Sequence, residues 1–260
     1  MTQSYLDRLF GLSGKTAVVI GGTGVLGGAM AVGLARAGAT VILAGRNPER
    51  GAERVAEIEK LGGKACCFPV EVAVRASMEE LLKSCLSVAP KIDVLINGAG
   101  TNAASPYFEV DDESWSRVIE SNLTGVHLGC QIFGKHMAET GGGSIINIGS
   151  VTAHLPLSRV FAYSASKAAV INLTQNVARE LATQKVRVNA LCPGFFPAEQ
   201  NRAILDQTRR DNIFRNTPVN RYGEPEELVG TVLLLASENA GGYITGATYY
   251  VDGGFTAMRF

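Results

Sequence analysis

The sequence has no surplus of charge of either sign, no pattern of paired cysteines and no long apolar segment. Its 24 Lys and Arg balance 24 Asp and Glu, so it lacks the basic surplus that binds nucleic acid, and no nucleic-acid partner is expected. The five cysteines include no C-x-x-C pair, which argues against a disulfide framework or a metal site and favours a reducing, cytoplasmic location. Neither a signal-peptide pattern nor a bilayer-spanning run is found, so no membrane association is expected.

Short apolar runs alternate with helical patterns along the whole chain. Apolar residues make up 46% of the sequence, which is enough for a sizeable core. Runs rich in apolar and β-branched residues predict strands at 16–20, 40–44, 64–70, 92–96, 144–148, 186–191 and 248–251. Helical patterns and their end signals predict helices at 26–37, 48–61, 77–88, 111–137 (one helix or two), 161–183, 199–214 and 225–236.

This alternation of strands and helices predicts one α/β domain. Uninterrupted apolar strands that are separated by helices are typical of a parallel sheet covered on both faces. We therefore expect a single doubly wound Rossmann domain over residues 1–260, with a parallel sheet of about seven strands and helices on both faces. The segment at about 195–215 is predicted to leave this scaffold as a substrate loop.

A glycine-rich loop lies between the first predicted strand and the first predicted helix. Its pattern, Gly22-x-Gly24-x-x-Gly27, occupies the position of a dinucleotide-binding loop. Glycines let the backbone turn tightly and approach a pyrophosphate, which then lies at the N-terminus of the helix. The pattern also fits a purely structural turn, but its place directly after the first strand favours a dinucleotide.

The second predicted strand ends in Ala44-Gly45-Arg46-Asn47, which contains no acid. A carboxylate at this point would bind the ribose hydroxyls of NAD(H), whereas a guanidinium pairs with a 2′-phosphate. The presence of Arg46 therefore favours NADP(H) over NAD(H). The alternative interpretation is an exposed arginine at a strand end.

Three side chains in the second half of the chain could carry out proton transfer. Ser150 follows the fifth predicted strand, and Tyr163 and Lys167 share one face of the next helix because they are four residues apart. An ammonium beside a phenol favours the phenolate, so we expect the pKa of Tyr163 to fall below its reference of roughly 10. Tyr163 would then act as a general acid or base, and Ser150 would donate a hydrogen bond to the substrate oxygen.

The complete set of motifs resembles the short-chain dehydrogenase/reductase family over residues 15–254. In order, these motifs are Gly21 to Gly27, Asn97-Gly98-Ala99-Gly100, Asn122, Ser150, Tyr163-Ser164-Ala165-Ser166-Lys167 and Asn189 to Gly194. The resemblance implies that Tyr163 transfers the proton and that Lys167 lowers its pKa and binds the nicotinamide ribose. It also implies that Ser150 holds the carbonyl oxygen and that Asn122 anchors a water linking Lys167 to solvent.

The resemblance further implies a set of cofactor-binding residues, in which 193–196 present backbone to the nicotinamide amide and 71–72 lie beside the adenine. Its members are Gly21, Thr23, Gly24, Val25, Leu26, Gly27, Arg46, Asn47, Glu71, Val72, Asn97, Ala99, Gly100, Tyr163, Lys167, Pro193, Gly194, Phe195 and Phe196. The departures from the family's pattern are Ile20, Val25 and Ala198. They concern the seating of the cofactor and leave the proton-transfer set unchanged.

The segment after Gly194 is similar to family members that act on sugar acids, such as mannonate (fructuronate) or gluconate-type oxidoreductases. Polar side chains there suit hydroxyls and a carboxylate, although the same residues also fit the start of a helical lid. The candidate substrate residues are Asn102, His154, Gln200, Asn201 and Arg202. A sugar acid or polyol is therefore the expected small-molecule substrate.

Other functions within the same fold stay open. One is a 3-oxoacyl (fatty-acid type) or general carbonyl reductase, although no basic patch for a carrier protein stands out. Another is a non-catalytic dinucleotide-sensing protein, which the complete set of Asn122, Ser150, Tyr163 and Lys167 disfavours. The helix at 161–183 carries small residues that permit close helix packing, and the family resemblance implies a homotetramer assembled through this helix and the one before it.

Overall fold

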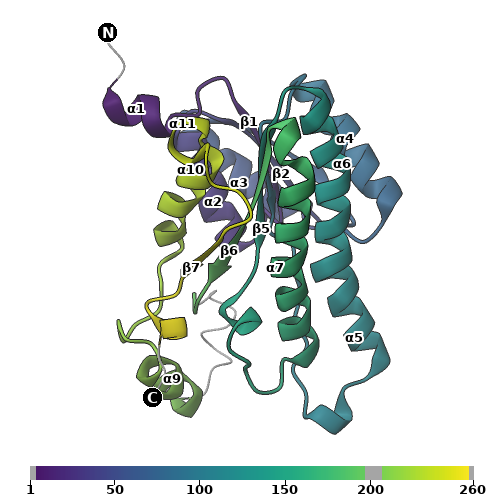
Figure 1. The fold of residues 1–260 in the computed structure, drawn as a ribbon, viewed down its shortest axis with the longest axis vertical. Helices are drawn as coiled ribbons and strands as arrows, with labels where there is room; N and C mark the ends of the chain where they lie inside the picture. Colours follow the sequence, from purple (N-terminus) through teal and green to yellow (C-terminus); the bar gives the residue numbers. More distant parts are fainter. Residues whose placement is uncertain (1–3, 197–206, 258–260) are drawn as a thin grey trace.

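A parallel sheet forms the central layer of the protein (Figure 1). The computed structural model describes residues 4–196 and 207–257, and within them the sheet has seven strands in the order β3-β2-β1-β4-β5-β6-β7. Every neighbouring pair is parallel, as the sequence predicted. The strands are β1 Thr16–Ile20, β2 Thr40–Gly45, β3 Lys64–Pro69, β4 Val94–Asn97, β5 Gly143–Ile148, β6 Val186–Pro193 and β7 Thr248–Val251.

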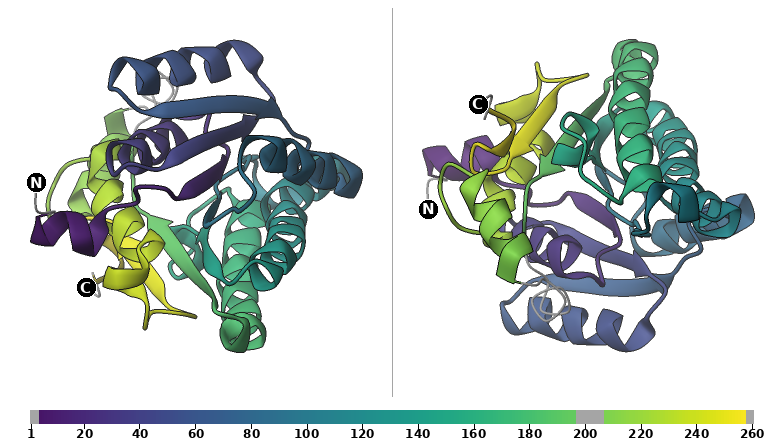
Figure 2. Two further views of the ribbon diagram at one scale, coloured as in Figure 1. Left: turned by 90° about the horizontal axis from the view of Figure 1, so that it is seen from above. Right: turned by 90° about the horizontal axis from the view of Figure 1, so that it is seen from below.

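Helices cover both faces of the sheet, so the protein has three layers (Figure 2). Side chains of β1 alternate between two cores: Val18 and Ile20 pack into one, and Ala17 and Val19 into the other. Because both faces are covered, β1 is buried throughout and reads as a continuous apolar run. The first core is closed by α4 Arg75–Val88, α6 Gly125–Glu139 and α7 Phe161–Leu181, and the second by α2 Val25–Arg36, α3 Pro48–Lys60 and α10 Val229–Ala236.

Two features of the helices differ from the sequence prediction. A short helix, α1, was not predicted although Ser4 and Asp7 form a capping box at its start. The segment 111–137 is neither one helix nor two separate ones, because a π-helical turn joins its two α-helices. The remaining elements are α1 Tyr5–Phe10, η1 Tyr107–Glu109, α5 Asp112–Ile119, the π-turn η2 Glu120–Thr124, η3 Val151–Ala153, η4 Ala182–Gln184, α9 Gln207–Arg215, η5 Pro225–Leu228, α11 Glu238–Gly241 and η6 Phe255–Ala257.

The carboxyl ends of the strands meet at the lower edge of the sheet in Figure 1. The chain passes from β1 to β2 on one side, whereas β4 pairs with β1 on the other side. Loops that leave neighbouring strands in opposite directions open a crevice, which is where open α/β sheets bind ligands. The predicted glycine loop follows β1, and the loop at 98–101 follows β4, so both border this crevice.

The described residues show neither disulfides nor membrane-spanning segments. All five cysteines are free thiols. Within 4–196 and 207–257, none of the helices combines the length and the apolar character that a bilayer span requires. The same residues contain no cluster of three or more His, Cys, Asp and Glu side chains that could hold a metal ion.

Candidate active site

The glycine loop packs so tightly that side chains are excluded from it. Gly21 has a φ of 84°, and a Cβ there would lie 2.7 Å from the backbone nitrogen of Ala99. A Cβ on Gly27 would overlap the carbonyl oxygen of Gly21. Gly24 is the N-cap of α2 and has no side-chain cap, so the first N–H groups of the helix are open to an anion. This cradle fits the pyrophosphate of a dinucleotide.

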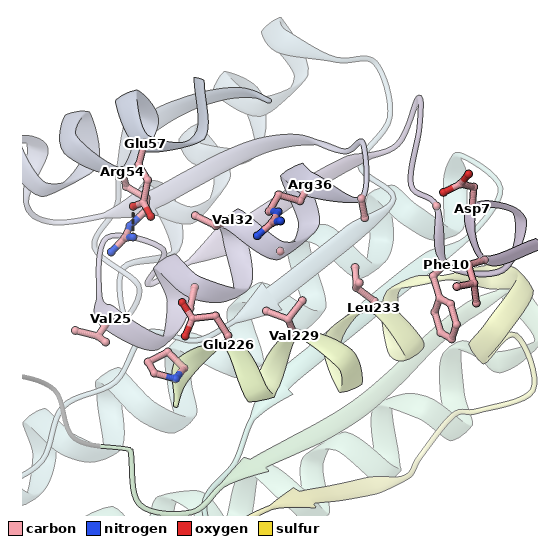
Figure 3. Close-up of a pocket in the computed structure, with 16 residues that line it drawn as sticks. Asp7, Phe10, Val25, Val32, Arg36, Arg54, Glu57, Glu226, Val229 and Leu233 are labelled. Atoms are coloured by element: carbon pink, nitrogen blue, oxygen red, sulfur yellow. Dashed lines mark hydrogen bonds and ion pairs between the residues drawn. The ribbon is translucent and has the colours of Figure 1, made fainter. Parts of the chain in front are cut away.

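Val25 and Thr23 take different positions around this loop. The Val25 side chain is 43% exposed and lines a separate cavity of about 610 Å³ on the outer side of α2, together with Val229 and Leu233 of α10 (Figure 3). That cavity contains none of the predicted proton-transfer residues, so it is separate from the site that they form. Thr23 packs against Gly45, where a Cβ would lie 2.6 Å from the Thr23 Oγ1. Leu26 is partly buried against the second core.

The residues that were predicted to border the adenosine lie at the ends of β2 and β3. Arg46 directly follows β2 and is exposed. The Asn47 side chain caps α3 by accepting a hydrogen bond of 2.9 Å from the Arg50 backbone, and its carbonyl accepts from the Gly51 N–H at 3.1 Å. Glu71 is exposed and its N–H donates to Ser77 Oγ at 2.9 Å. Val72 abuts Gly125, because a Cβ on Gly125 would lie 3.0 Å from the Val72 Cβ.

The Asn97 side chain points into the core rather than towards the crevice. Its Nδ2 donates to Asn147 Oδ1 at 2.8 Å, and its Oδ1 is buried without a partner. Asn97 can therefore face a cofactor only through its backbone. The next residues do reach the crevice, because the backbone of Gly98 and Ala99 lies against Gly21.

Ser150, Tyr163 and Lys167 come together at the carboxyl end of β5. Ser150 follows this strand as the N-cap of η3, and its side chain lies near enough to the Tyr163 hydroxyl to lower the pKa of that group. Tyr163 lies in the first turn of α7, and the Lys167 ammonium is 5.6 Å from the centre of its ring. Lys167 is buried, and its Nζ donates to the carbonyl oxygen of Ile148 at 2.7 Å. A substrate carbonyl that reaches Tyr163 therefore meets two hydroxyls side by side.

The pKa values of this group differ from the sequence prediction. Burial raises the pKa of Tyr163 and outweighs the hydrogen bond with Ser150, which lowers it. The prediction that the pKa of Tyr163 falls was therefore wrong for the protein without cofactor. Burial also lowers the pKa of Lys167 from 10.5 to about 8, against a smaller opposing effect of Cys192. Lys167 thus holds a labile proton near neutral pH and is directed towards Ile148.

Asn122 lies in the π-turn η2 and is fully buried. Its amide holds the backbone of Thr101 from both sides: Oδ1 accepts from the Thr101 N–H at 2.8 Å and Nδ2 donates to the Thr101 carbonyl at 2.9 Å. The second Nδ2 hydrogen goes to Ser166 Oγ at 3.2 Å. Both amide hydrogens are therefore used, and a water bound at Asn122 would have to donate to one of its oxygens. π-Turns occur frequently at functional sites.

The segment 193–196 is held by contacts with β7 and with the residues that follow it, and by contacts with Gly223. Pro193 ends β6 beside Val251, and Gly194 lies so close to Asp252 that a Cβ would come within 2.6 Å of the Asp252 Cα. The rings of Phe195 and Phe255 meet edge to face with centroids 5.0 Å apart. Phe196 fills the space beside Gly223. These contacts hold the segment in place, together with hydrogen bonds from the Gly194 N–H to Val251 at 2.9 Å and from the Gly223 N–H to Phe195 at 3.0 Å.

The candidate substrate residues are only partly placed by the structure. Asn102 and His154 are exposed, on the loops after β4 and β5. The His154 ring lies 6.1 Å from the ring of Tyr250 on β7, a neighbour that was not predicted from the sequence. The two loops are joined by a hydrogen bond of 3.1 Å from the Ser105 N–H to the Arg159 carbonyl. Gln200, Asn201 and Arg202 lie outside the described residues.

Two contributions to the site are backbone groups that sequence reasoning missed. The carbonyl of Ile148 accepts from Lys167, and the peptide of Thr101 is held by Asn122. Neither has a side-chain signature, since any residue type provides the same backbone groups. Only the packing of β5 and of the loop after β4 against α7 reveals them.

Fold and site together define a dinucleotide-dependent oxidoreductase. A family profile described as "Enoyl-(Acyl carrier protein) reductase" matches residues 23–256. The chain is 40% identical to "Uncharacterized oxidoreductase UxuB" of Bacillus subtilis, over 95% of this chain and 96% of that protein. It is also 38% identical to a "3-oxoacyl-[acyl-carrier-protein] reductase" of Synechocystis, over 94% of this chain and 97% of that one.

A solved structure is similar over almost the whole chain. It is a gluconate 5-dehydrogenase from Burkholderia cenocepacia in complex with NADP and tartrate, with a TM-score of 0.93 and 32% identity, and it covers 98% of this chain and 100% of its own. The protein therefore belongs to the short-chain dehydrogenase/reductase family, and it is an oxidoreductase that acts on CH–OH groups.

Proposed function

We propose that the protein is an NADP(H)-dependent oxidoreductase that interconverts a carbonyl and a secondary alcohol on a sugar acid or polyol. The observation that carries this proposal is the meeting of Ser150, Tyr163 and Lys167 at the carboxyl edge of the sheet, next to the open N-terminus of α2. A bound nicotinamide dinucleotide supplies or accepts the hydride. The side chains of the chain supply the proton and hold the oxygen.

Tyr163 is the proposed general acid in the reduction direction and the general base in oxidation. Its hydroxyl gives a proton to the carbonyl oxygen as the carbon is reduced, while Ser150 donates a hydrogen bond to the same oxygen and stabilises its developing charge. Lys167 restores the proton of Tyr163 because its own pKa of about 8 lies near neutral pH. Asn122 keeps the loop at 98–101 against the cofactor side of this group.

The mechanism is tested with the variant Tyr163→Phe. We expect turnover to be lost and the affinity for NADPH to remain close to that of the wild type, since the phenyl ring keeps the packing and loses only the hydroxyl. NADPH binding is measured by fluorescence and turnover by absorbance at the nicotinamide band. Turnover retained in Tyr163→Phe would rule out Tyr163 as the acid.

The proposed preference for NADP(H) rests on Arg46, which is exposed directly after β2 with no carboxylate beside it. A guanidinium at this position pairs with a 2′-phosphate. We expect a lower KM for NADPH than for NADH, and we expect Arg46→Ala to raise the KM for NADPH while leaving that for NADH unchanged. A wild-type enzyme that prefers NADH would contradict the role of Arg46.

The substrate class is supported by the similarity to a gluconate 5-dehydrogenase and by the exposed polar residues Asn102 and His154 beside the crevice. The test is a panel of 5-ketogluconate, other keto sugar acids, polyols and simple ketones, each assayed with both cofactors. A sugar acid is expected to have the highest kcat/KM. A higher value for simple ketones would refute the assignment.

A 3-oxoacyl reductase is the second candidate, because the chain is 38% identical to such an enzyme. An acyl thioester carried by a protein would need a docking surface in addition to the catalytic group. A 3-oxoacyl thioester is therefore included in the panel, free and bound to an acyl carrier protein. Preference for the carrier-bound form would replace the sugar acid as the assigned substrate.

We also propose that the protein works in the cytoplasm as a homotetramer. The five free thiols suit a reducing compartment. A groove of about 420 Å³ runs between α6 and α7, and its lining includes the apolar side chains of Ala138, Val177 and Leu181. A second copy of the chain could cover this groove. Light scattering tests the assembly, and a monomeric mass would refute it.

A further inference from the structure

Ser166 connects the catalytic turn of α7 to the loop that follows β4. It lies between Tyr163 and Lys167 on the helix and is fully buried. Its hydroxyl donates to the Tyr163 carbonyl at 2.7 Å and accepts from Asn122 Nδ2 at 3.2 Å. We propose that Ser166 is a positioning residue, which sets the place of Thr101 and Gly100 beside Lys167 by fixing the amide of Asn122.

The hydroxyl of Ser166 can only accept a hydrogen bond from Asn122, and cannot donate one to it. Its single proton is committed to the carbonyl of Tyr163, so its oxygen can only accept from Asn122. This orients the amide with Nδ2 towards α7 and Oδ1 towards the Thr101 N–H. The amide then has the orientation that holds the peptide of Thr101 by both of its groups.

Thr101 is connected to the proton-transfer group through its neighbour Gly100. Gly100 directly precedes Thr101, and a Cβ on Gly100 would lie 3.2 Å from Asn122 Oδ1 and 3.7 Å from Lys167 Nζ. The preceding Gly98 and Ala99 lie against Gly21 of the glycine loop. A shift of Asn122 would therefore change the spacing between the loop after β4 and the Lys167 ammonium.

A serine that bonds back to its own helix is common and by itself indicates no function. The contact with Asn122 distinguishes Ser166, because it joins two elements that are far apart in the sequence. Loss of the hydroxyl would leave an Asn122 N–H buried without a partner. An unpaired buried donor is costly, so Asn122 and the peptide that it holds are expected to loosen.

The chain offers a matched control on the same helix. Thr174 is also fully buried, donates to the Val170 carbonyl at 2.8 Å and accepts from Asn147 Nδ2 at 3.0 Å. Its bonds reproduce those of Ser166, but they connect α7 to Asn147, the penultimate residue of β5. Thr174→Val therefore removes a comparable pair of hydrogen bonds without touching Asn122 or Thr101.

The first readout is the hydrogen exchange of the Thr101 amide in the protein without cofactor, followed by NMR. Loss of about one hydrogen bond predicts an exchange rate that is faster by roughly tenfold in Ser166→Ala, and unchanged in Thr174→Val. Ser166→Cys keeps the shape of the side chain but its thiol forms only weak hydrogen bonds, so it is expected to accelerate hydrogen exchange at the Thr101 amide even if Ser166→Ala folds poorly. Melting temperatures of all three variants measure the general loss of stability.

The second readout is the affinity for NADPH, which is expected to fall by roughly tenfold in Ser166→Ala and Ser166→Cys and to remain unchanged in Thr174→Val. The inference assumes the proposed roles of Tyr163 and Lys167, but neither readout needs turnover, so it fails separately from the proposed function. Thr101 exchange at the wild-type rate in Ser166→Cys would overturn it. NADPH affinities that fall equally in the Ser166 and Thr174 variants would also overturn it, since they would show a merely structural role.

Discussion

Replacing Lys167 by methionine is expected to stabilise the folded protein at neutral pH. Burial lowers the pKa of Lys167 from 10.5 to about 8, which corresponds to roughly 3 kcal/mol of unfavourable charge burial when the ammonium is protonated. Methionine removes this cost but also removes the hydrogen bond of 2.7 Å to the Ile148 carbonyl, worth about 1 kcal/mol. The expected net gain in the free energy of unfolding is therefore about 2 kcal/mol at pH 7.

The gain should depend on pH in a defined direction. Below pH 8 the lysine is protonated in both the folded and the unfolded chain, and the full cost is present. As the pH rises from about 8 to 10.5, the folded protein loses the proton first, so the wild type becomes more stable relative to the variant. Above this window the variant lacks only the hydrogen bond and should be the less stable protein by about 1 kcal/mol.

Urea unfolding of the wild type and of Lys167→Met between pH 6 and pH 10 measures this difference. The expected result is a stability difference that falls steadily above pH 8, together with loss of turnover in the variant. A difference that does not change with pH would refute the reasoning about the buried charge. A variant that is less stable at pH 7 would show that the hydrogen bond outweighs the cost of burial.

Two further predictions concern close contacts. Gly27→Ala is expected to abolish NADPH binding because its Cβ would overlap the Gly21 carbonyl. In Gly33→Ala the new Cβ would lie 2.5 Å from the Val229 side chain. This variant should lower the free energy of unfolding by about 1–3 kcal/mol and leave NADPH binding intact. Equal NADPH affinities in the two variants would contradict this. Cys192 is fully buried and burial raises its pKa to about 11, so a maleimide should not label it in the folded protein, and rapid labelling would disprove this.

The strands and the tight glycine loop after β1 could be predicted from local sequence alone. β1 is a continuous apolar run because both of its faces are covered, and the glycines that follow it are required by contacts too close for a Cβ. The alternation of such runs with helical patterns identified the doubly wound fold. Local pattern did not reveal the π-turn at Glu120–Thr124, whose backbone differs from a helix only in the spacing of its hydrogen bonds.

The fold brings Ser150, Tyr163 and Lys167 together, as their predicted grouping requires, but the predicted pKa shift of Tyr163 was wrong. Four-residue spacing places Tyr163 and Lys167 on one face of α7, and that much follows from helix geometry. The direction of the Lys167 ammonium depends on Ile148, which belongs to another element. Spacing alone predicted a lowered pKa for Tyr163, whereas burial in the folded protein, which spacing does not show, raises it.

The sequence by itself determined the fold class, and it predicted the glycine loop and the group of Ser150, Tyr163 and Lys167, because each depends on residue type and short-range spacing. Tertiary structure decided how these groups behave. It buries Lys167 until its pKa is about 8, and it brings Thr101, Asn122 and Ser166 into one chain of hydrogen bonds. Both results depend on desolvation and on contacts between distant elements, which exist only after the sheet and its helices have packed.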